Sequence, residues 1–172
     1  SSHTAESSAV VRGQVEKYSW VDIGSSYLPS DILAAVLLAQ LESLEEINAK
    51  RERVVGQYRE RLQGLADNGS IELPFIPADC RPNNHMFYIL AQNRNVRTEL
   101  IEHLKNKGIR AVFHYVPLHD SPMGKKLGYD VMELPVTRSI SERLLRLPLY
   151  CDLSDSEVEF VCDEIIAFFQ KN

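Results

Sequence analysis

The chain has 172 residues, of which 44% are hydrophobic and 25% charged, and its formal net charge is -5 at pH 7. This balance is typical of one folded globular domain and argues against an intrinsically disordered chain. The negative charge argues against nucleic acid as a partner, because neutralising phosphates requires a clustered excess of lysine and arginine. No apolar run approaches the ~20 residues that a membrane span needs, so no membrane partner is expected.

Three cysteines, Cys80, Cys151 and Cys162, form an odd and widely spaced set with no Cys-x-x-Cys pair. Such a set favours a reducing compartment over a disulfide framework, so a cytoplasmic protein is expected. No cysteine or histidine pair has the spacing of a zinc site, and no metal is expected.

The N-terminal third of the chain predicts one long helix after an irregular start. Residues 1–16 lack periodicity and are interpreted as a flexible leader or the cut end of a longer chain, and residues 17–172 as one domain. Extended chain over 18–23 and a loop over 24–29 precede Ser30, which suits a helix N-cap. Leucines at helical spacing then predict a helix to about Leu65, ending near Asn68-Gly69. At 1.5 Å per residue this helix would be roughly 50 Å long, so it is expected to bend, break or pack against protein outside the chain.

The remainder alternates strands and helices, which indicates an α+β fold: a small sheet covered by helices on one side, with a long N-terminal helix. Strands are predicted over 71–74, 85–90 and 109–115, with a helix from about Arg97 to Lys107 and a short helix from Ser121-Pro122. Two capping boxes, Ser139–Glu142 and Ser154–Glu157, predict two more helices. The first would end at Pro148, and the second would turn four apolar side chains inward: Val158, Val161, Ile165 and Phe168.

No self-contained catalytic motif is present, but two polar segments are candidate sites. The hydroxyl-rich loop Gly24–Ser30 leads into a helix N-terminus and could bind a phosphate; ordinary capping plus a turn is the alternative that local sequence favours. The second segment carries His114, Tyr115 and His119 after a predicted strand. The two imidazoles, five residues apart in extended chain, would face opposite ways and share no metal.

Each histidine of the second segment could instead be structural, one satisfied in the core and the other exposed. His85, before its strand, carries the same ambiguity, and His103 lies on a polar helix face and is expected to be solvated.

Four segments in order carry a resemblance to a known family: Lys17–Ser30, Asn84–Tyr88, His114–His119 and Arg143–Tyr150. Together they resemble the C-terminal part of the DegT/DnrJ/StrS family of nucleotide-sugar aminotransferases, which use pyridoxal 5'-phosphate (PLP) and have fold type I. The resemblance runs from about Arg12 to Phe169. It implies the small domain of a homodimer that transfers an amino group from glutamate to a dTDP-4-keto-6-deoxy-sugar, a precursor of cell-surface polysaccharide. The long helix would be the link between the family's large and small domains.

The resemblance also implies roles for particular residues. Ser26, with Ser25 and Tyr27 beside it, would contact the phosphate of the neighbouring subunit's PLP, although many relatives carry asparagine at the position of Ser26. The sugar-nucleotide pocket would be lined by four residues: His119, His114, Tyr115 and His85.

The lysine that holds PLP in this family belongs to the large domain, and no residue of this chain corresponds to it. Transamination requires that amine, and Lys17 lies in the wrong segment. This polypeptide alone is therefore expected to be inactive, with no catalytic residue and no bound PLP. The alternative is a non-catalytic nucleotide-sugar-binding or assembly module that keeps the fold.

Overall fold

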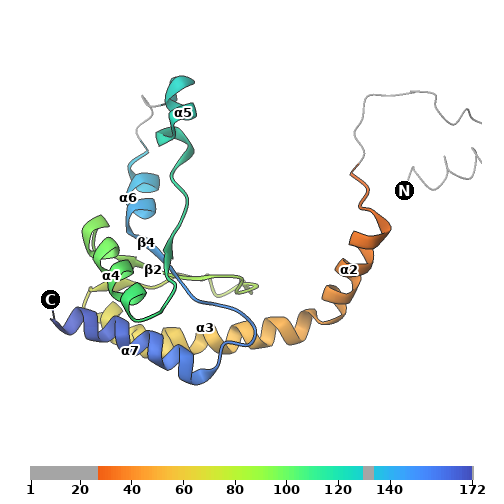
Figure 1. Ribbon diagram of the computed structural model, residues 1–172, viewed down its shortest axis with the longest axis horizontal. Helices are drawn as coiled ribbons and strands as arrows, with labels where there is room; N and C mark the ends of the chain where they lie inside the picture. The colour runs from red at the N-terminus through yellow and green to blue at the C-terminus, as the bar shows by residue number, and fades with distance from the viewer. Residues whose placement is uncertain (1–26, 130–133, 172) are drawn as a thin grey trace, which may run out of the picture. The chain divides into compact units, whose positions relative to one another are not determined.

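The computed structural model describes residues 27–129 and 134–171 (Figure 1). The extended segment 18–23, Lys17, Ser25 and Ser26 lie outside the described residues. The chain divides into two compact units, residues 1–40 and 41–172.

The predicted long helix is two helices, α2 (Asp31–Glu42) and α3 (Leu44–Asp67), with Ser43 between them. The predicted cap is confirmed, since Ser30 Oγ accepts a hydrogen bond from Leu33 N at 3.3 Å. The helix is broken at Ser43, which is one of the outcomes expected from its length. Ser43 has φ -96° and ψ 6°, outside the helical minimum, at the point where the side-chain pattern changes from apolar throughout to amphipathic.

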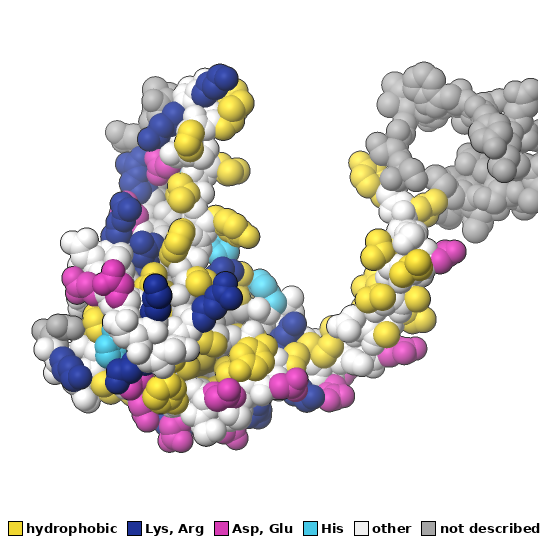
Figure 2. Space-filling model, viewed as in Figure 1, with side chains coloured by type: hydrophobic (Ala, Val, Ile, Leu, Met, Phe, Trp, Pro, Cys, Tyr) yellow, Lys and Arg dark blue, Asp and Glu magenta, His cyan; other side chains and the backbone are white. Residues whose placement is uncertain are grey.

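The two helices bury different fractions of their apolar side chains. Helix α3 buries a stripe of five residues: Val54, Val55, Tyr58, Leu62 and Leu65. Helix α2 buries none, and apolar side chains cover much of its visible surface (Figure 2). Helix α3 ends where predicted: Asn68 follows it, and Gly69 takes a φ of +77° that favours glycine.

A four-stranded antiparallel sheet lies in the second unit, in the order β1-β2-β4-β3. The strands are β1 (Ile71–Glu72), β2 (Phe87–Ala91), β3 (Val112–Phe113) and β4 (Leu144–Leu147). Three coincide with predicted strands, although β1 and β3 are shorter than expected. Pairing of Phe87 with Leu147 and of Ile89 with Leu145 places these four buried side chains on one face of the sheet.

Strand β4 corrects the sequence analysis, because residues 144–147 were predicted to be helical. The helix here is α6 (Pro135–Arg143), so Ser139 lies inside it and caps nothing. An apolar run such as Leu144–Leu147 fits a helix or a strand equally well. Burial of Leu145 and Leu147 against the core, with ladder bonds to β2 and β3 on both sides, decides for the strand.

The remaining helices start at well-formed caps. Asn93 Oδ1 accepts from Asn95 N (2.9 Å) and Val96 N (3.1 Å) at the start of α4 (Arg94–Asn106). The 3₁₀ turn η1 (Leu118–Asp120) leads into α5 (Pro122–Lys126). Helix α7 (Asp155–Lys171) begins with the predicted capping box: Ser154 N donates to Glu157 Oε2 (2.8 Å), and Glu157 N donates to Ser154 Oγ (3.3 Å).

Helices α3, α4 and α7 pack with the sheet around one apolar core. The rings of Tyr58 and Phe87 stack with centroids 5.0 Å apart, and Tyr58 Oη donates to Pro148 O at 2.9 Å. The four inward residues predicted for α7 are buried, which confirms that helix. The α+β class is confirmed as well. Among the described residues, no helix combines the length and apolarity needed to cross a bilayer.

His103 was predicted to be solvated, and this is wrong. Its Nε2 lies 3.0 Å from Glu164 Oε2, and its ring packs at 51° against Phe168 with centroids 5.6 Å apart. Lys107 Nζ donates to the other oxygen of the same carboxylate at 3.0 Å. Lys107 and then His103 hold the pKa of Glu164 below its ordinary value, so this group ties α4 to α7.

Candidate functional site

Residues 114–129, which follow β3, form an arm that carries η1 and α5 (Figure 1). Helix α5 packs so closely on η1 that a Cβ added at Gly124 would lie 2.1 Å from Leu118 O. Ser121 closes the corner, because its Oγ accepts from Gly124 N (3.0 Å) and donates to Leu118 O (2.6 Å). This packing leaves His119 with only 7% of its surface exposed.

His119 is the one buried polar residue among the described part of the chain. Its Nε2 makes no hydrogen bond and lies 3.5 Å from Asp120 Oδ2. The other oxygen of Asp120 pairs with Arg138 Nη2 at 3.3 Å, which lowers the pKa of Asp120. His119 therefore lies beside a carboxylate, and it does not line the grooves on either side of the arm.

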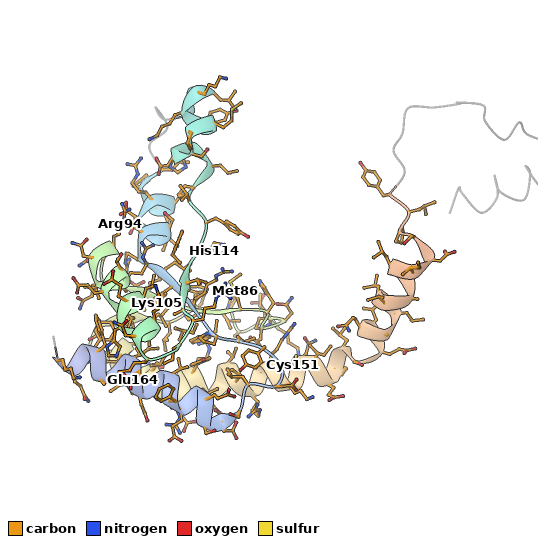
Figure 3. All side chains as sticks on the ribbon, viewed as in Figure 1. Met86, Arg94, Lys105, His114, Cys151 and Glu164 are labelled. Atoms are coloured by element: carbon orange, nitrogen blue, oxygen red, sulfur yellow. The ribbon has the colours of Figure 1, made fainter. Side chains whose placement is uncertain are left out.

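His114 does line a groove. The concavity of about 510 Å³ runs along the base of the arm and is called here the His114–Arg146 groove. It is bounded by Phe113, His114, Tyr115, Val116, Leu118 and Arg146. His114 Nδ1 and Arg146 Nε are buried and have no hydrogen-bond partner in the described structure. Figure 3 labels His114 where the arm leaves the sheet.

Two orphaned ring and guanidinium nitrogens in a mostly apolar groove suit an oxygen acceptor. A buried polar atom without a partner loses the free energy of its hydration, so a ligand that restores a hydrogen bond gains that contact. Phosphate and carboxylate oxygens are the acceptors that guanidinium prefers. The edge-on packing of His114 and Tyr115, with centroids 4.8 Å apart, holds the imidazole in place.

Arg146 is a site residue that the sequence analysis missed. It pairs with Tyr88 on β2 and with Val112 on β3, so it lies on the sheet face opposite Leu145 and Leu147. The available signal was a single charge inside the apolar run Leu144–Leu149. That charge alternates with buried leucines only in a strand, and the segment was predicted as a helix.

The other predicted site residues lie apart from this groove or outside the described residues. His85 is exposed, its Nδ1 lies 2.8 Å from Asn83 Oδ1, and it lines a separate pocket of about 250 Å³ with residues 74–76. Tyr27 is described and is 90% exposed. Ser25 and Ser26 lie outside the described residues.

The described residues do not fit the PLP that the resemblance implies. Lys50 pairs with Glu46 at 2.8 Å and Lys107 with Glu164 at 3.0 Å. The four other described lysines are exposed: Lys105, Lys125, Lys126 and Lys171. No amine among residues 27–129 and 134–171 therefore lies in a buried polar site that could enclose the coenzyme's aldehyde.

Other reactive groups are no better placed. Burial raises the pKa of Cys162 to about 12, which removes the thiolate at neutral pH. Within the described ranges, no three His, Cys, Asp or Glu side chains gather closely enough to hold a metal ion. What the arrangement can do is bind an anionic or hydroxyl-rich ligand through imidazole and guanidinium nitrogens.

Comparison with known proteins identifies the family to which the chain is similar. The profile of the DegT/DnrJ/EryC1/StrS aminotransferase family matches residues 3–166. The chain is 32% identical over 150 residues to the dTDP-4-dehydro-2,3,6-trideoxy-D-glucose 4-aminotransferase of Saccharopolyspora spinosa, covering 87% of this chain and 36% of that protein. It is 31% identical over 154 residues to the dTDP-3-amino-3,4,6-trideoxy-alpha-D-glucose transaminase of Streptomyces venezuelae, covering 89% and 39%.

A solved structure gives the same result. DesV of S. venezuelae, crystallised in complex with a ketimine intermediate, superposes with a TM-score of 0.80 at 30% identity. The match covers 95% of this chain and 43% of that one. The chain spans between 35% and 40% of the length of the four curated relatives compared.

Proposed function

Because this chain belongs to the DegT/DnrJ/EryC1/StrS aminotransferase family, we propose that it forms the substrate-binding small domain of a nucleotide-sugar aminotransferase. The observation that carries the proposal is the pair of orphaned nitrogens, His114 Nδ1 and Arg146 Nε, in the groove at the base of the arm. In this role the two side chains donate hydrogen bonds to an acidic or hydroxyl group of the sugar nucleotide. Tyr115 lines the same groove, and His119, which is buried beside Asp120, is kept as a second proposed substrate-positioning residue.

The reaction proposed for the whole enzyme is amino transfer from glutamate to a dTDP-4-keto-6-deoxy-sugar. Two relatives are named for dTDP-sugars, which supports that nucleotide and that class of substrate. PLP supplies the electron-accepting chemistry when it is bound. Ser26, flanked by Ser25 and Tyr27, is proposed to donate to its phosphate from a neighbouring subunit. His85 is also proposed to contact the substrate. The whole enzyme is proposed to be cytoplasmic.

A homodimer is part of the same proposal. Helix α2 exposes six large apolar side chains, each by more than half of its surface: Ile32, Leu33, Val36, Leu37, Leu38 and Leu41. Such a surface is unfavourable in water and usually marks an interface. Sedimentation equilibrium of the chain distinguishes the dimer from a monomer, and a monomer at all concentrations would refute it.

The experiment that tests the substrate role is a titration with dTDP-glucose, followed by isothermal calorimetry. We expect saturable binding to the 172-residue chain that weakens about tenfold in Arg146→Leu, which is the loss of roughly one charge-assisted hydrogen bond. Leucine suits this strand position and removes a buried polar atom, so the variant should fold.

Arg110→Leu is the matched control. Arg110 is exposed, lies two residues before the start of β3, and lines neither of the grooves beside the arm. Arg110→Leu removes the same charge as Arg146→Leu but outside the groove, so its affinity for dTDP-glucose should equal that of the wild-type chain. Equal weakening in both variants, or no binding at all, would contradict the proposed role of the groove.

A further inference from the structure

Helix α3 ends in a hydrogen-bonded turn that encloses an asparagine followed by a glycine. Gly69 N donates to Ala66 O at 3.1 Å, and Ser70 N donates to Leu65 O at 2.9 Å. These are the two crossed hydrogen bonds of a Schellman ending. Ser70 N also donates to Asn68 Oδ1 at 3.0 Å. The backbone and the side chain of this turn are therefore both engaged.

Helix α4 ends in the same way without an asparagine. Gly108 has a φ of +78°, and its N donates to Lys105 O at 3.0 Å. The second crossed bond runs from Ile109 N to Leu104 O at 2.9 Å. Lys107 is the C-cap residue here, at the position that the asparagine has in α3. This kind of ending therefore requires the glycine but not an asparagine before it.

An asparagine followed by glycine can lose its side-chain amide without an enzyme, because glycine has no side chain to obstruct attack by its own nitrogen. Asn68-Gly69 is the one such step in the 172 residues. Both residues are exposed, and a Cβ added at Gly69 would meet nothing within 4 Å. Solvent therefore reaches the atoms that would react, and no neighbouring side chain covers them.

The closed turn nevertheless opposes the reaction. Ring closure would join Gly69 N to Asn68 Cγ, so the backbone must first turn this nitrogen towards the Asn68 side chain. The ψ of Asn68 is 1°, which keeps the two atoms apart. Gly69 N must also leave Ala66 O, and Asn68 Oδ1 must leave Ser70 N. The last turn of α3 has to open before the ring can form, and helix ends open at a low free energy.

We propose that Asn68 is a site of spontaneous deamidation whose rate is set by the opening of the last turn of α3. In the first step the bond between Gly69 N and Asn68 Cγ forms and the bond between Cγ and Nδ2 breaks. Nδ2 leaves as ammonia and takes the proton of Gly69 N. Water then opens the five-membered imide at either carbonyl and gives aspartate or isoaspartate, with no change of oxidation state.

The products alter the connection between two core elements. Isoaspartate routes the main chain through its side-chain methylene, which moves Gly69 out of the position that the crossed hydrogen bonds require. Ile71, two residues later, is 2% exposed and pairs with Ala91 in the sheet. Either product also adds a negative charge beside Asp67 at the helix C-terminus, where the dipole disfavours it. Deamidation is therefore expected to weaken the connection between α3 and β1.

The test follows the conversion of amide to acid in the full chain by peptide mass mapping, at neutral pH in buffer and in urea that unfolds the chain. We expect conversion of Asn68 to be at least about tenfold faster in urea, because the turn is open there. Hydrogen exchange measures the opening independently. The factor by which folding slows deamidation should match, within about threefold, the factor by which it slows exchange of the Gly69 amide.

One substitution opens the turn without changing the reacting residues. Ser70→Pro removes the N–H that bonds Leu65 O, and Ser70 lies before the first paired residue of β1. Conversion of Asn68 in buffer should become at least about tenfold faster in this variant, while its rate in urea should stay at the wild-type value. Should the variant fail to fold, the comparison of deamidation with hydrogen exchange in the wild-type chain still decides.

Two controls test the chemistry. Asn106 is also exposed at a helix end but precedes a lysine, so it should stay unconverted in buffer and in urea while Asn68 reacts. Gly69→Ala, measured in urea so that folding has no influence, should slow conversion of Asn68 by about tenfold or more because a methyl group obstructs the nitrogen. Equal rates of Asn68 conversion in buffer and in urea, no conversion in urea, or equal conversion of Asn106 would overturn the proposal.

Discussion

Gly124 shows how a single residue determines the shape of the arm. Its Cα approaches Leu118 O so closely that any side chain would collide with backbone. Leu118 O also accepts from Ser121 N at 3.2 Å and from Ser121 Oγ at 2.6 Å, so a displaced carbonyl would break the corner that buries His119.

Gly124→Ala should therefore loosen the arm while leaving the core intact. Overpacking of this kind typically costs about 1–3 kcal/mol, here confined to η1 and α5. Hydrogen exchange measures it: the amides of Lys125 and Leu127 should exchange faster, and those of α7 should not.

Gly56→Ala is the control for this substitution. Gly56 lies on the exposed side of α3, and an added Cβ meets nothing within 4 Å. Alanine is the better helix former there by roughly 0.5–1 kcal/mol, so this variant should be slightly more stable. Loss of arm protection in both variants, or in neither, would contradict the steric explanation.

At the same scale, the candidate site was only partly accessible from sequence. His114 and Tyr115 were identified because strand ends often present functional groups and because the family resemblance implies a substrate pocket there, and both line a groove. Arg146 could not be identified, because its position depends on the pairing of β4 with β2. Its partner there is Tyr88, which lies 58 residues earlier in the chain (146 − 88). Sequence patterns indicate local secondary structure, and they do not show which distant strands pair with each other.

The capping box at the start of α7 contains a carboxyl group, Glu157, whose titration makes the stability of the fold depend on pH. Hydrogen bonds from the Ser154 side chain and then from its backbone hold the pKa of Glu157 below its ordinary value of 4.5. A carboxyl whose pKa is depressed by folding stabilises the native state above the unfolded pKa. That contribution is lost as the pH falls through the folded pKa.

Glu157→Gln should therefore be less stable than the wild-type chain at pH 7, and the difference should shrink as the pH falls below about 4.5. Urea unfolding measures this difference in the free energy of unfolding at pH 7 and at about pH 3, which is below the usual pKa range of carboxyl groups. Glu60→Gln serves as the control, because the carboxylate of Glu60 makes no hydrogen bond among the described residues. A difference that stays constant with pH would refute the capping explanation.

The two predicted capping boxes explain where element prediction works and where it fails. Ser154–Glu157 has the reciprocal bonds that the motif requires and starts a helix whose inward residues are buried as expected. Ser139–Glu142 has the same letters, yet Ser141 Oγ donates to Arg138 O inside a helix that began at Pro135. The motif is local, and the sheet competes for the residues that follow it. Where tertiary pairing decides, as for Leu144–Leu147, local patterns are insufficient.

For the whole molecule, the position of its lysines predicts how the chain responds to PLP. Because the described amines are paired or exposed, we expect no saturable covalent adduct after incubation with PLP and borohydride reduction, measured by mass spectrometry of the intact chain. We likewise expect no turnover of glutamate. A full-length relative treated in the same way should gain one coenzyme mass. One equivalent of coenzyme on a single lysine of this chain, Lys17 included, would refute the expectation.

The strand order has a consequence for biosynthesis. Strand β4 lies between β2 and β3, and α7 packs on α3, so the centre of the sheet and the partner of the first core helix both come late in the chain. When synthesis has reached Arg143, β2 and β3 have been made but β4, the strand that joins them, has not. The apolar faces of α3 and β2 must therefore stay uncovered until the residues after Arg143 have been synthesised, and folding of this core can finish only after α7 has emerged.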